Sequence, residues 1–318
     1  MHVGLPDIAI LGLVFSIFRD EIERWLISWK SNAWLEAQMS TALRIVHGNF
    51  GRVALLDMDC SLVRHAHPHC HVLLKVEGAD TQFVVGNRIH PLTDSVAVLV
   101  DGWQPHSYVH DPARPRTLIL ALYVEPEWLK AFRPGWVASG APGFFGHPHG
   151  ELSPRIRKLM MDLASDMMAR PECRAEHEAL LSELMIAVIE RFTPWKSFPR
   201  SIRELNASAC DRRIRRAADY IRVNAGGEAD IDTLAKEAGL SRAHFFRLFQ
   251  SSIGLPPKVY LNVVRMEQAM EAVLHHDFPV REIGTRLGFS DPAHFTRFFR
   301  NNAGVSPSEF RQVSRLAG

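Results

Sequence analysis

The stretch that decides the fold occurs twice in the C-terminal third of this chain. Residues 231–241 read IDTLAKEAGLS, and residues 280–290, 49 positions later, read VREIGTRLGFS. In each copy the apolar residues recur at the spacing of one helix face. A glycine near the end, Gly239 or Gly288, permits the left-handed backbone that commonly terminates a helix. Each copy therefore predicts a short helix followed by a tight turn.

A second helix is predicted after each turn. Ser241 and Ser290 are natural N-caps for it, and residues 244–249 (HFFRLF) and 294–299 (HFTRFF) place phenylalanines on one face and polar side chains on the other. This is the pattern of a helix-turn-helix unit whose second helix is free to enter a DNA major groove. An ordinary helical hairpin is the alternative, but the repetition of turn glycines, caps and basic faces disfavours it.

Residues 211–311 resemble the AraC-type DNA-binding domain. The resemblance is carried by the two copies, by a joining helix expected over residues 257–275, and by the ending GVSPSEFR at residues 304–311. Gly284 departs from the pattern, because the family usually has alanine there. The resemblance implies a first helix over residues 212–224, tandem helix-turn-helix units, double-stranded DNA as a partner, and the function of a sequence-specific transcriptional activator that contacts RNA polymerase.

The resemblance also implies which side chains read DNA, near the start of each second helix and one turn further on. Arg247 and Arg297 are the best candidates for paired hydrogen bonds to guanine, each contributing about 1–3 kcal/mol of discrimination. Ala243 and Phe246 offer only apolar contact, so the first helix is expected to be less specific. Arg300, Lys258 and Arg265 are candidates for phosphate contacts or, equally, solvated charges. The expected DNA-binding set is Arg242, Ala243, His244, Phe246, Arg247, Ala293, His294, Thr296, Arg297 and Arg300.

The N-terminal half has a different pattern, with short apolar runs separated by turn residues. The runs are residues 53–56, 72–76, 82–85, 96–100 and 118–123. Runs of this length and spacing predict a small antiparallel sandwich or barrel. Helical stripes follow at residues 156–167 and 180–192. These two helices are the expected dimerisation element of a homodimer, with packing inside the subunit as an equal alternative.

The expected fold class is α+β with two domains. Residues 1–43 are assigned to a helical extension, 44–150 to a cupin-like effector-sensing domain, 151–192 to a helical dimerisation segment, 193–210 to a linker, and 211–318 to the DNA-binding domain. Net charge is +4 from residue 211 onward and −2 before it, which suits a basic DNA reader on a near-neutral body. This excess of positive charge in the C-terminal domain is small, which argues against nonspecific architectural DNA binding.

The N-terminal apolar stretch, Ile8–Phe18, is too short to cross about 30 Å of hydrocarbon as a helix. No basic region precedes it, so a signal peptide is not expected. A helical extension that packs on the protein is favoured over a membrane anchor, and a translation start near Met39 is a further alternative. Four scattered cysteines without paired spacing indicate reduced thiols, and thus a cytoplasmic protein with no membrane partner.

A cluster of histidines precedes the second predicted strand, where residues 65–71 read HAHPHCH, and a later predicted strand ends in the sequence GWQPH at residues 102–106. Regular alternation would place His65, His67, His69 and His71 on one face, although Pro68 favours an irregular start. The cluster lies ahead of Gly78 and is the most unusual feature of the N-terminal half.

This region resembles the cupin-like sensor domains found ahead of such DNA-binding domains. Aligned on Gly78, His65 and His67 take the two histidine positions of the cupin metal motif, His71 replaces its glutamate, and His106 takes the last position, displaced by one residue. Two alternatives follow: a bound Zn, Ni or Fe(II) ion, or a metal-free pocket for a small-molecule effector. Trp103, Tyr108 and Phe83 are candidate walls of either site, although a core role is the default for aromatic side chains on strands.

A metal-dependent cupin enzyme, or a metal sensor, fused to a DNA-binding domain is the competing function. The replacement of glutamate by His71 and the displaced second motif disfavour catalysis. The sequence thus predicts an effector-responsive regulator and no enzyme activity.

Overall fold

A computed structural model describes residues 40–140, 143–193, 211–227, 230–253 and 255–315. The apolar stretch Ile8–Phe18 and nearly all of the expected linker lie outside these residues. The first strand, β1, spans Thr41–Gly48. Residues 41–43 therefore belong to a sheet, which corrects their assignment to the helical extension over residues 1–43. Among the described residues, no helix combines the length and apolar character that a membrane span requires.

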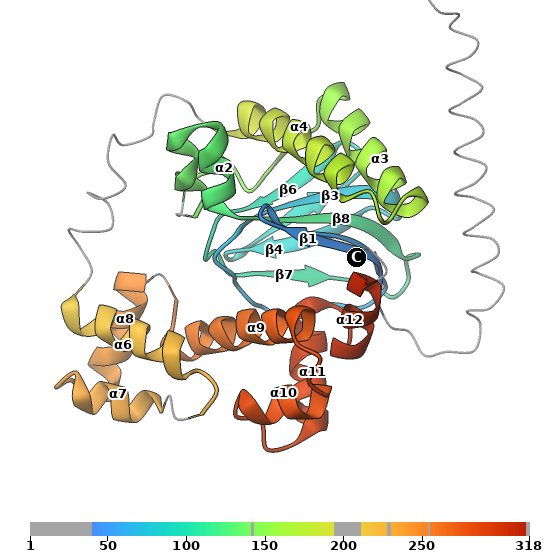
Figure 1. Cartoon of the computed structure of the whole chain (residues 1–318). Coiled ribbons are helices and arrows are strands. Elements are labelled where there is room, and N and C mark those ends of the chain that lie inside the picture. The colour runs from blue at the N-terminus through green and yellow to red at the C-terminus, as the bar shows by residue number, and fades with distance from the viewer. Residues whose placement is uncertain (1–39, 141–142, 194–210, 228–229, 254, 316–318) are drawn as a thin grey trace, which may run out of the picture. The chain divides into compact units, whose positions relative to one another are not determined.

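The N-terminal domain contains two antiparallel sheets (Figure 1). The six-stranded sheet has the order β1-β2-β8-β3-β6-β9, and the three-stranded sheet has the order β5-β4-β7. No ladder joins the two sheets among the described strands, so the domain is a sandwich rather than a closed barrel. The remaining strands are β2 (Gly51–Met58), β3 (Cys70–Gly78), β4 (Thr81–Val85), β5 (Arg88–Leu92), β6 (Val96–Val100), β7 (His106–Val109), β8 (Thr117–Val124) and β9 (His149–Glu151).

The five predicted strand segments all lie in these strands, and the inner faces of the two sheets share one core. Leu73 from the larger sheet and Phe83 and Tyr108 from the smaller one are buried in the same cluster. Strands β3 and β8 pair in a register that sets His71 opposite Tyr123. This register matters for function, because it brings an aromatic ring beside the histidine cluster.

Helices α3 (Pro154–Ala169) and α4 (Arg174–Phe192) cover the outer face of the six-stranded sheet (Figure 1). Their apolar stripes, including Ile156, Leu163 and Leu184, are buried in one cluster with strand residues such as Val72. The side chains that suggested a dimerisation element are thus occupied inside the subunit, and the homodimer stays a prediction. Two short helices, α2 (Pro126–Phe132) and the 3-10 helix η1 (Pro134–Gly140), had no counterpart in the sequence analysis.

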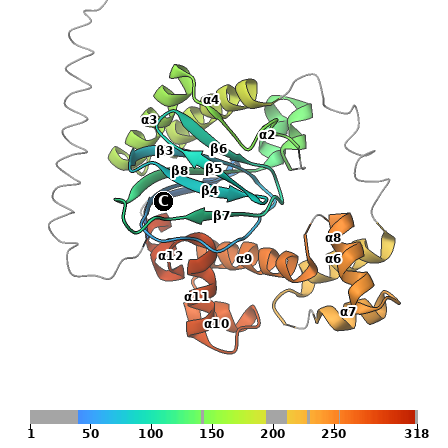
Figure 2. The same ribbon diagram turned by 180° about the vertical axis from the view of Figure 1, so that it is seen from behind.

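The C-terminal domain is entirely helical (Figure 2). The two predicted helix-turn-helix units are present as α7–α8 and α10–α11, and the predicted helices at residues 212–224 and 257–275 are observed at those bounds. The helices are α6 (Arg212–Asn224), α7 (Ile231–Glu237), α8 (Arg242–Ile253), α9 (Pro257–His275), α10 (Val280–Arg286), α11 (Pro292–Ala303) and α12 (Pro307–Arg315).

Helix α9 joins the two units by packing on both. Tyr260 and Val263, in its first half, are buried in the core of the first unit. Ala269 and Val273, in its second half, are buried in the core of the second unit. One continuous helix thus serves two cores, and this holds the two recognition helices in a set relation within the domain.

A close backbone approach also links the two units. A Cβ atom on Gly226, beyond the end of α6, would lie 2.2 Å from the carbonyl oxygen of Arg286, so only glycine fits there. Beside it, Nε of Arg265 donates a hydrogen bond to the carbonyl oxygen of Ala225 at 2.8 Å. Arg265, a candidate phosphate contact from the sequence, therefore ties α9 to the end of α6.

Candidate functional site

Helices α8 and α11 present the same face to solvent. At equivalent positions, Ala243 and Ala293 are exposed, as are Arg247 and Arg297. The phenylalanines between and after them, Phe245 and Phe249 in α8 and Phe295 and Phe299 in α11, are fully buried. The shared order of exposed and buried positions gives each helix a polar edge of the kind that a recognition helix presents to the major groove.

In the first recognition helix, Arg242 forms an ion pair with Asp232 of the preceding helix, with Nη1 2.8 Å from the carboxylate. Both side chains are largely exposed, so the pair adds little stability and can open. His244 and Arg247 are exposed, and Phe246 is half-buried. Within the described part of the chain, no protein acceptor binds the guanidinium of Arg247.

In the second recognition helix, His294 is exposed and its ring meets the edge of Phe289, with the ring centroids 5.3 Å apart. Arg297 is exposed and, among the described residues, has no protein acceptor. Thr296 and Arg300 are half-buried. The structure thus brings the predicted residues of each helix to one edge. At the position where α8 has Phe246, α11 has Thr296, whose hydroxyl can form hydrogen bonds.

The N-caps of the recognition helices agree with only one of the two predictions. Ser241 caps α8, since its hydroxyl accepts a hydrogen bond from the backbone N–H of His244 at 3.3 Å. Helix α11 is instead capped by Asp291, whose carboxylate accepts from the N–H of Ala293 at 2.9 Å. The predicted cap Ser290 is therefore wrong. The second copy has one extra residue in this turn, which moves the capping position forward by one.

Replacement of Asp291 with alanine is expected to lower the free energy of unfolding by about 1 kcal/mol, because the cap hydrogen bond at the start of α11 is lost. The matched variant Ser290→Ala should change it by less than about 0.5 kcal/mol, since Ser290 is exposed and caps nothing. Urea denaturation of the full chain, followed by circular dichroism, measures both. Equal losses in the two variants would contradict the assignment of the cap.

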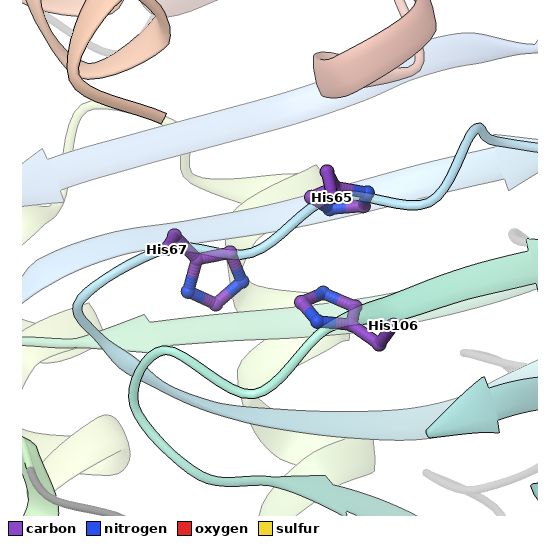
Figure 3. Close-up of side chains that lie close together, drawn as sticks. All are labelled: His65, His67 and His106. Atoms are coloured by element: carbon purple, nitrogen blue, oxygen red, sulfur yellow. The ribbon is translucent and has the colours of Figure 1, made fainter. Parts of the chain in front are cut away.

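The predicted histidine cluster forms one cage in the sandwich domain (Figure 3). His65 and His67 come from the irregular segment before β3, and His106 begins β7. One nitrogen from each lies within 4.8 Å of the others. His71, the second residue of β3, closes the cage: its Nδ1 lies 3.1 Å from Nε2 of His67 and 3.4 Å from Nε2 of His106.

His69 does not join the cage. Its Nε2 lies 2.7 Å from the carboxylate of Glu125, and this hydrogen bond lowers the pKa of Glu125. Strand β3 starts only at Cys70, so the regular alternation that would align four histidines is absent, and the irregular start expected from Pro68 is what the chain adopts.

Burial favours the neutral form of the cage histidines. Burial, with the neighbouring imidazoles as a second cause, lowers the pKa of His67, His71 and His106 well below the usual value. His67, His71 and His106 are each at most 6% exposed. Neutral imidazoles are the form in which histidine accepts a hydrogen bond at one ring nitrogen or binds a metal ion.

Tyr123 is a member of this site that sequence reasoning missed. Its ring stacks on His71, with centroids 4.0 Å apart and an interplanar angle of 26°. It also meets His67 at 5.0 Å. A tyrosine at the end of an apolar run gives no signal by itself, because the contact depends on the pairing register of β3 and β8.

Of the three candidate wall residues, Tyr108 and Phe83 have the core role that is the default for aromatic side chains on strands, and Trp103 contacts the cage through its backbone. Tyr108 is 1% exposed and packs on Phe83 in the sandwich core, with centroids 5.1 Å apart. Trp103 contributes its backbone: its N–H donates to the carbonyl oxygen of His67 at 2.7 Å, and its φ of 66° is left-handed. None of the three rings contacts a cage histidine among the described aromatic contacts. Trp103 therefore holds His67 beside the turn that carries His106, and Tyr108 stabilises the core.

Two protein-family models match this chain, one in each of its two domains. A family model described as a helix-turn-helix domain matches residues 234–313, and one described as an AraC-like ligand binding domain matches residues 57–185. The chain is 25% identical over 154 residues to the lactose operon transcription activator of Staphylococcus xylosus, covering 48% of this chain and 54% of that protein.

Two further proteins extend the comparison. The Msm operon regulatory protein of Streptococcus mutans is 30% identical over 132 residues, covering 42% of this chain and 45% of that protein. The chain thus spans about half the length of the curated relatives it matches. The fold is similar to a crystal structure of apo ToxT from Vibrio cholerae, with a TM-score of 0.53 and 12% identity over 85% of this chain and 99% of that one.

The two family matches fall on the sandwich domain and on the tandem helix-turn-helix domain, and the aligned relatives are transcription regulators. The chain thus carries an AraC-like ligand-binding domain ahead of a helix-turn-helix domain, an arrangement similar to that of the AraC-type transcriptional regulators.

Proposed function

We propose that this protein is an effector-responsive transcription activator that reads DNA through α8 and α11. The observation that carries the proposal is the repeated exposed edge of the two recognition helices, each with an arginine at the same position, Arg247 and Arg297. Arginine can form two hydrogen bonds to guanine in the major groove. Two such edges in one chain suit successive major grooves, which lie about 34 Å apart on one face of DNA.

The sandwich domain is the proposed site of effector binding. Its family model is described as a ligand-binding domain, and its histidine cage is a buried group of polar side chains of the kind that orients a bound small molecule. An effector changes DNA binding only if it binds one state of the protein more tightly than the other. Action in the cytoplasm, contact with RNA polymerase and a homodimer complete the proposed function.

Footprinting of the full chain on the DNA upstream of its own gene tests sequence-specific binding. We expect one protected site with two segments about 10 base pairs apart, because each recognition helix occupies one major groove. A shuffled sequence of the same composition is the control and should show no footprint at the same protein concentration. Equal protection of both sequences would contradict specific recognition.

A thermal-shift screen of metabolites against the full chain tests the effector. A true effector should raise the melting temperature, because it binds the native state and not the unfolded chain. The same compound should then change the affinity for the footprinted DNA, and a compound that raises the melting temperature without changing DNA affinity is a ligand but not an effector. If every stabilising compound leaves DNA affinity unchanged, effector control is wrong.

A further inference from the structure

A second pair of histidines, separate from the cage, connects the edges of the two sheets. His90 lies on β5, at one edge of the three-stranded sheet, and His149 begins β9, at one edge of the six-stranded sheet. Their Nδ1 atoms are 3.0 Å apart and their ring centroids 5.0 Å apart. His90 stands opposite Phe83 in the pairing of β4 and β5 and is 7% exposed, so its ring points into the sandwich, whereas His149 is exposed.

The hydrogen bond between these rings tolerates some protonation states and not others. Two facing Nδ1 atoms need one proton and one lone pair between them. A proton taken up by the exposed His149 preserves the bond, because His149 then donates to His90. A further proton on His90 sets two N–H groups against each other. It also places charge beside Nε2 of His90, which is buried and has no hydrogen-bond partner among the described residues. Protonation of His90 is therefore incompatible with the observed contact.

The surroundings of His90 do not compensate a positive charge. Burial, then His149 and Arg88, lower the pKa of His90. Strands β4 and β6, packed beside it, carry no charged or titratable side chain. The other charged or titratable side chains on the neighbouring segments are exposed, belong to the cage or are already ion-paired: Glu77, His147, Glu151 and Arg191, then His71, and Lys75 with Asp80 and Asp94. None of the charges that act on His90 is negative.

The segment that carries His149 also holds the end of α4. The N–H of Gly146 donates to the carbonyl oxygen of Phe192, the last residue of α4, at 3.0 Å. Nε of Arg191 donates to the carbonyl oxygen of Glu151. A Cβ atom on Gly150 would collide with the ring of Phe192, so this ring lies directly on β9. Residues 146–151 thus fix the last turn of α4, beyond which the chain continues to the DNA-binding domain.

We propose that His90 and His149 form an acid-sensitive clasp, closed at neutral pH and opened when His90 takes up a proton, which frees β9 and the end of α4. The inference adds acid as an input beyond the proposed effector, and its effect on DNA rests on the proposed function. Histidine is the side chain suited to this role, since its charge changes between about pH 5 and 8.

The direction of the pH effect follows from proton uptake. With the clasp open, His90 is hydrated and titrates near its ordinary pKa of about 6.5, whereas the closed form takes up this proton only at lower pH. The closed form is therefore at full stability above the ordinary pKa and loses stability as the pH falls below it. Between pH 7.5 and 5.0 the ratio of open to closed forms rises by up to about 30-fold from His90 alone.

Hydrogen exchange of the full chain, read by mass spectrometry at pH 7.5 and 5.0, tests the clasp. After division by the intrinsic exchange rates, protection of the amides at residues 146–152 should fall about 10-fold or more in the parent at the lower pH. In His90→Asn, an amide stands near the position of Nδ1 and does not titrate, so the fall should be less than about 2-fold. The matched variant His147→Asn replaces an exposed histidine and should behave like the parent.

Circular dichroism establishes that each variant is folded, and His90→Gln is the second neutral variant if His90→Asn is not. Equal pH dependence of protection in the parent and in a folded neutral variant would overturn the clasp. Gel-shift titrations on the footprinted site, at both pH values, test its regulatory role. Protonation of His244 and His294 affects all variants alike, so the informative quantity is the ratio of the affinities at the two pH values.

We expect this ratio to differ by about 3-fold or more between the parent and His90→Asn, because opening of the clasp is coupled to DNA binding. Equal ratios, with the exchange result as expected, would mean that the clasp opens without affecting the DNA-binding domain, and the regulatory role would be wrong. Absence of any footprint in the parent, with acid-dependent exchange intact, would instead contradict the proposed DNA reading. The two failures are thus distinguishable.

Discussion

Replacing Arg297 with alanine is expected to reduce the preference for the cognate DNA site by roughly 5- to 150-fold, equivalent to about 1–3 kcal/mol. Arg297 is exposed on the edge of α11, and no described residue competes for its guanidinium. Arg247 holds the equivalent position in α8, so Arg247→Ala should have an effect of the same kind at the other half of the site. Gel-shift titrations against the footprinted site and against variants with one base pair changed measure both effects.

Lysine at the same positions is the informative control. Arg297→Lys keeps the charge but cannot form the planar pair of hydrogen bonds that guanine accepts. We therefore expect Arg297→Lys to bind all sequences with nearly the parental salt dependence, yet to lose most of the discrimination at one position. If alanine and lysine variants both retained the parental sequence preference, Arg297 would be a phosphate contact or a bystander, and the assignment of base reading would be wrong.

Replacing Phe295 with alanine should destabilise the protein by about 3–5 kcal/mol. Phe295 is fully buried at the crossing of α10 and α11 and packs against Phe289 and Phe299 at centroid distances of 5.3 and 6.1 Å. A Cβ atom on Gly284 would lie 2.9 Å from its ring, so the glycine that replaces the usual alanine accommodates this ring. Loss of the ring leaves a cavity beneath α11, and specific DNA binding should weaken in parallel.

Urea denaturation of the full chain measures this loss, and Val223→Ala is the matched control. Val223 is 82% exposed on α6, so its truncation should change the free energy of unfolding by less than about 0.5 kcal/mol. A loss below about 1 kcal/mol for Phe295→Ala would mean that the helix crossing is not packed around this ring. If Phe295→Ala lost about 3–5 kcal/mol in the free energy of unfolding but kept the parental DNA affinity, the orientation of α11 would not depend on the packing of its buried face.

Much of the C-terminal domain could be predicted because its signals are local. Glycines, small crossing residues and apolar spacing all lie within short stretches, and the structure has helices at both copies of the repeat. The cap of α11 shows the limit of local reasoning. Ser290 and Asp291 are both good caps by residue type. The choice between them depends on where α11 begins: the extra residue in the second turn sets the start of the helix at Pro292, so Asp291 takes the cap position.

The sequence predicts that the N-terminal domain is built from strands, but it does not predict how those strands pair. Alternating apolar runs predicted its strands, but strands pair with partners distant in sequence, and a change of register by one residue reverses every side chain. The register of β3 and β8, which sets Tyr123 against His71, therefore had no local signal. The same is true of α3 and α4, whose apolar stripes suit a sheet as well as a second subunit.

The repeated stretch at residues 231–241 and 280–290 by itself determined that this protein carries two helix-turn-helix units and the kind of surface they expose. The tertiary structure decided how they are joined, through a helix α9 shared by two cores, and how the histidines of the sandwich domain are arranged. Residue type singled out His65, His67 and His106 as site candidates. His106, however, is distant from the other two in sequence and reaches them only because the start of β7 and the segment before β3 are joined by main-chain hydrogen bonds between His65 and His106. Local sequence specifies short-range hydrogen bonding and periodicity, whereas convergence of groups distant in sequence requires the packed chain.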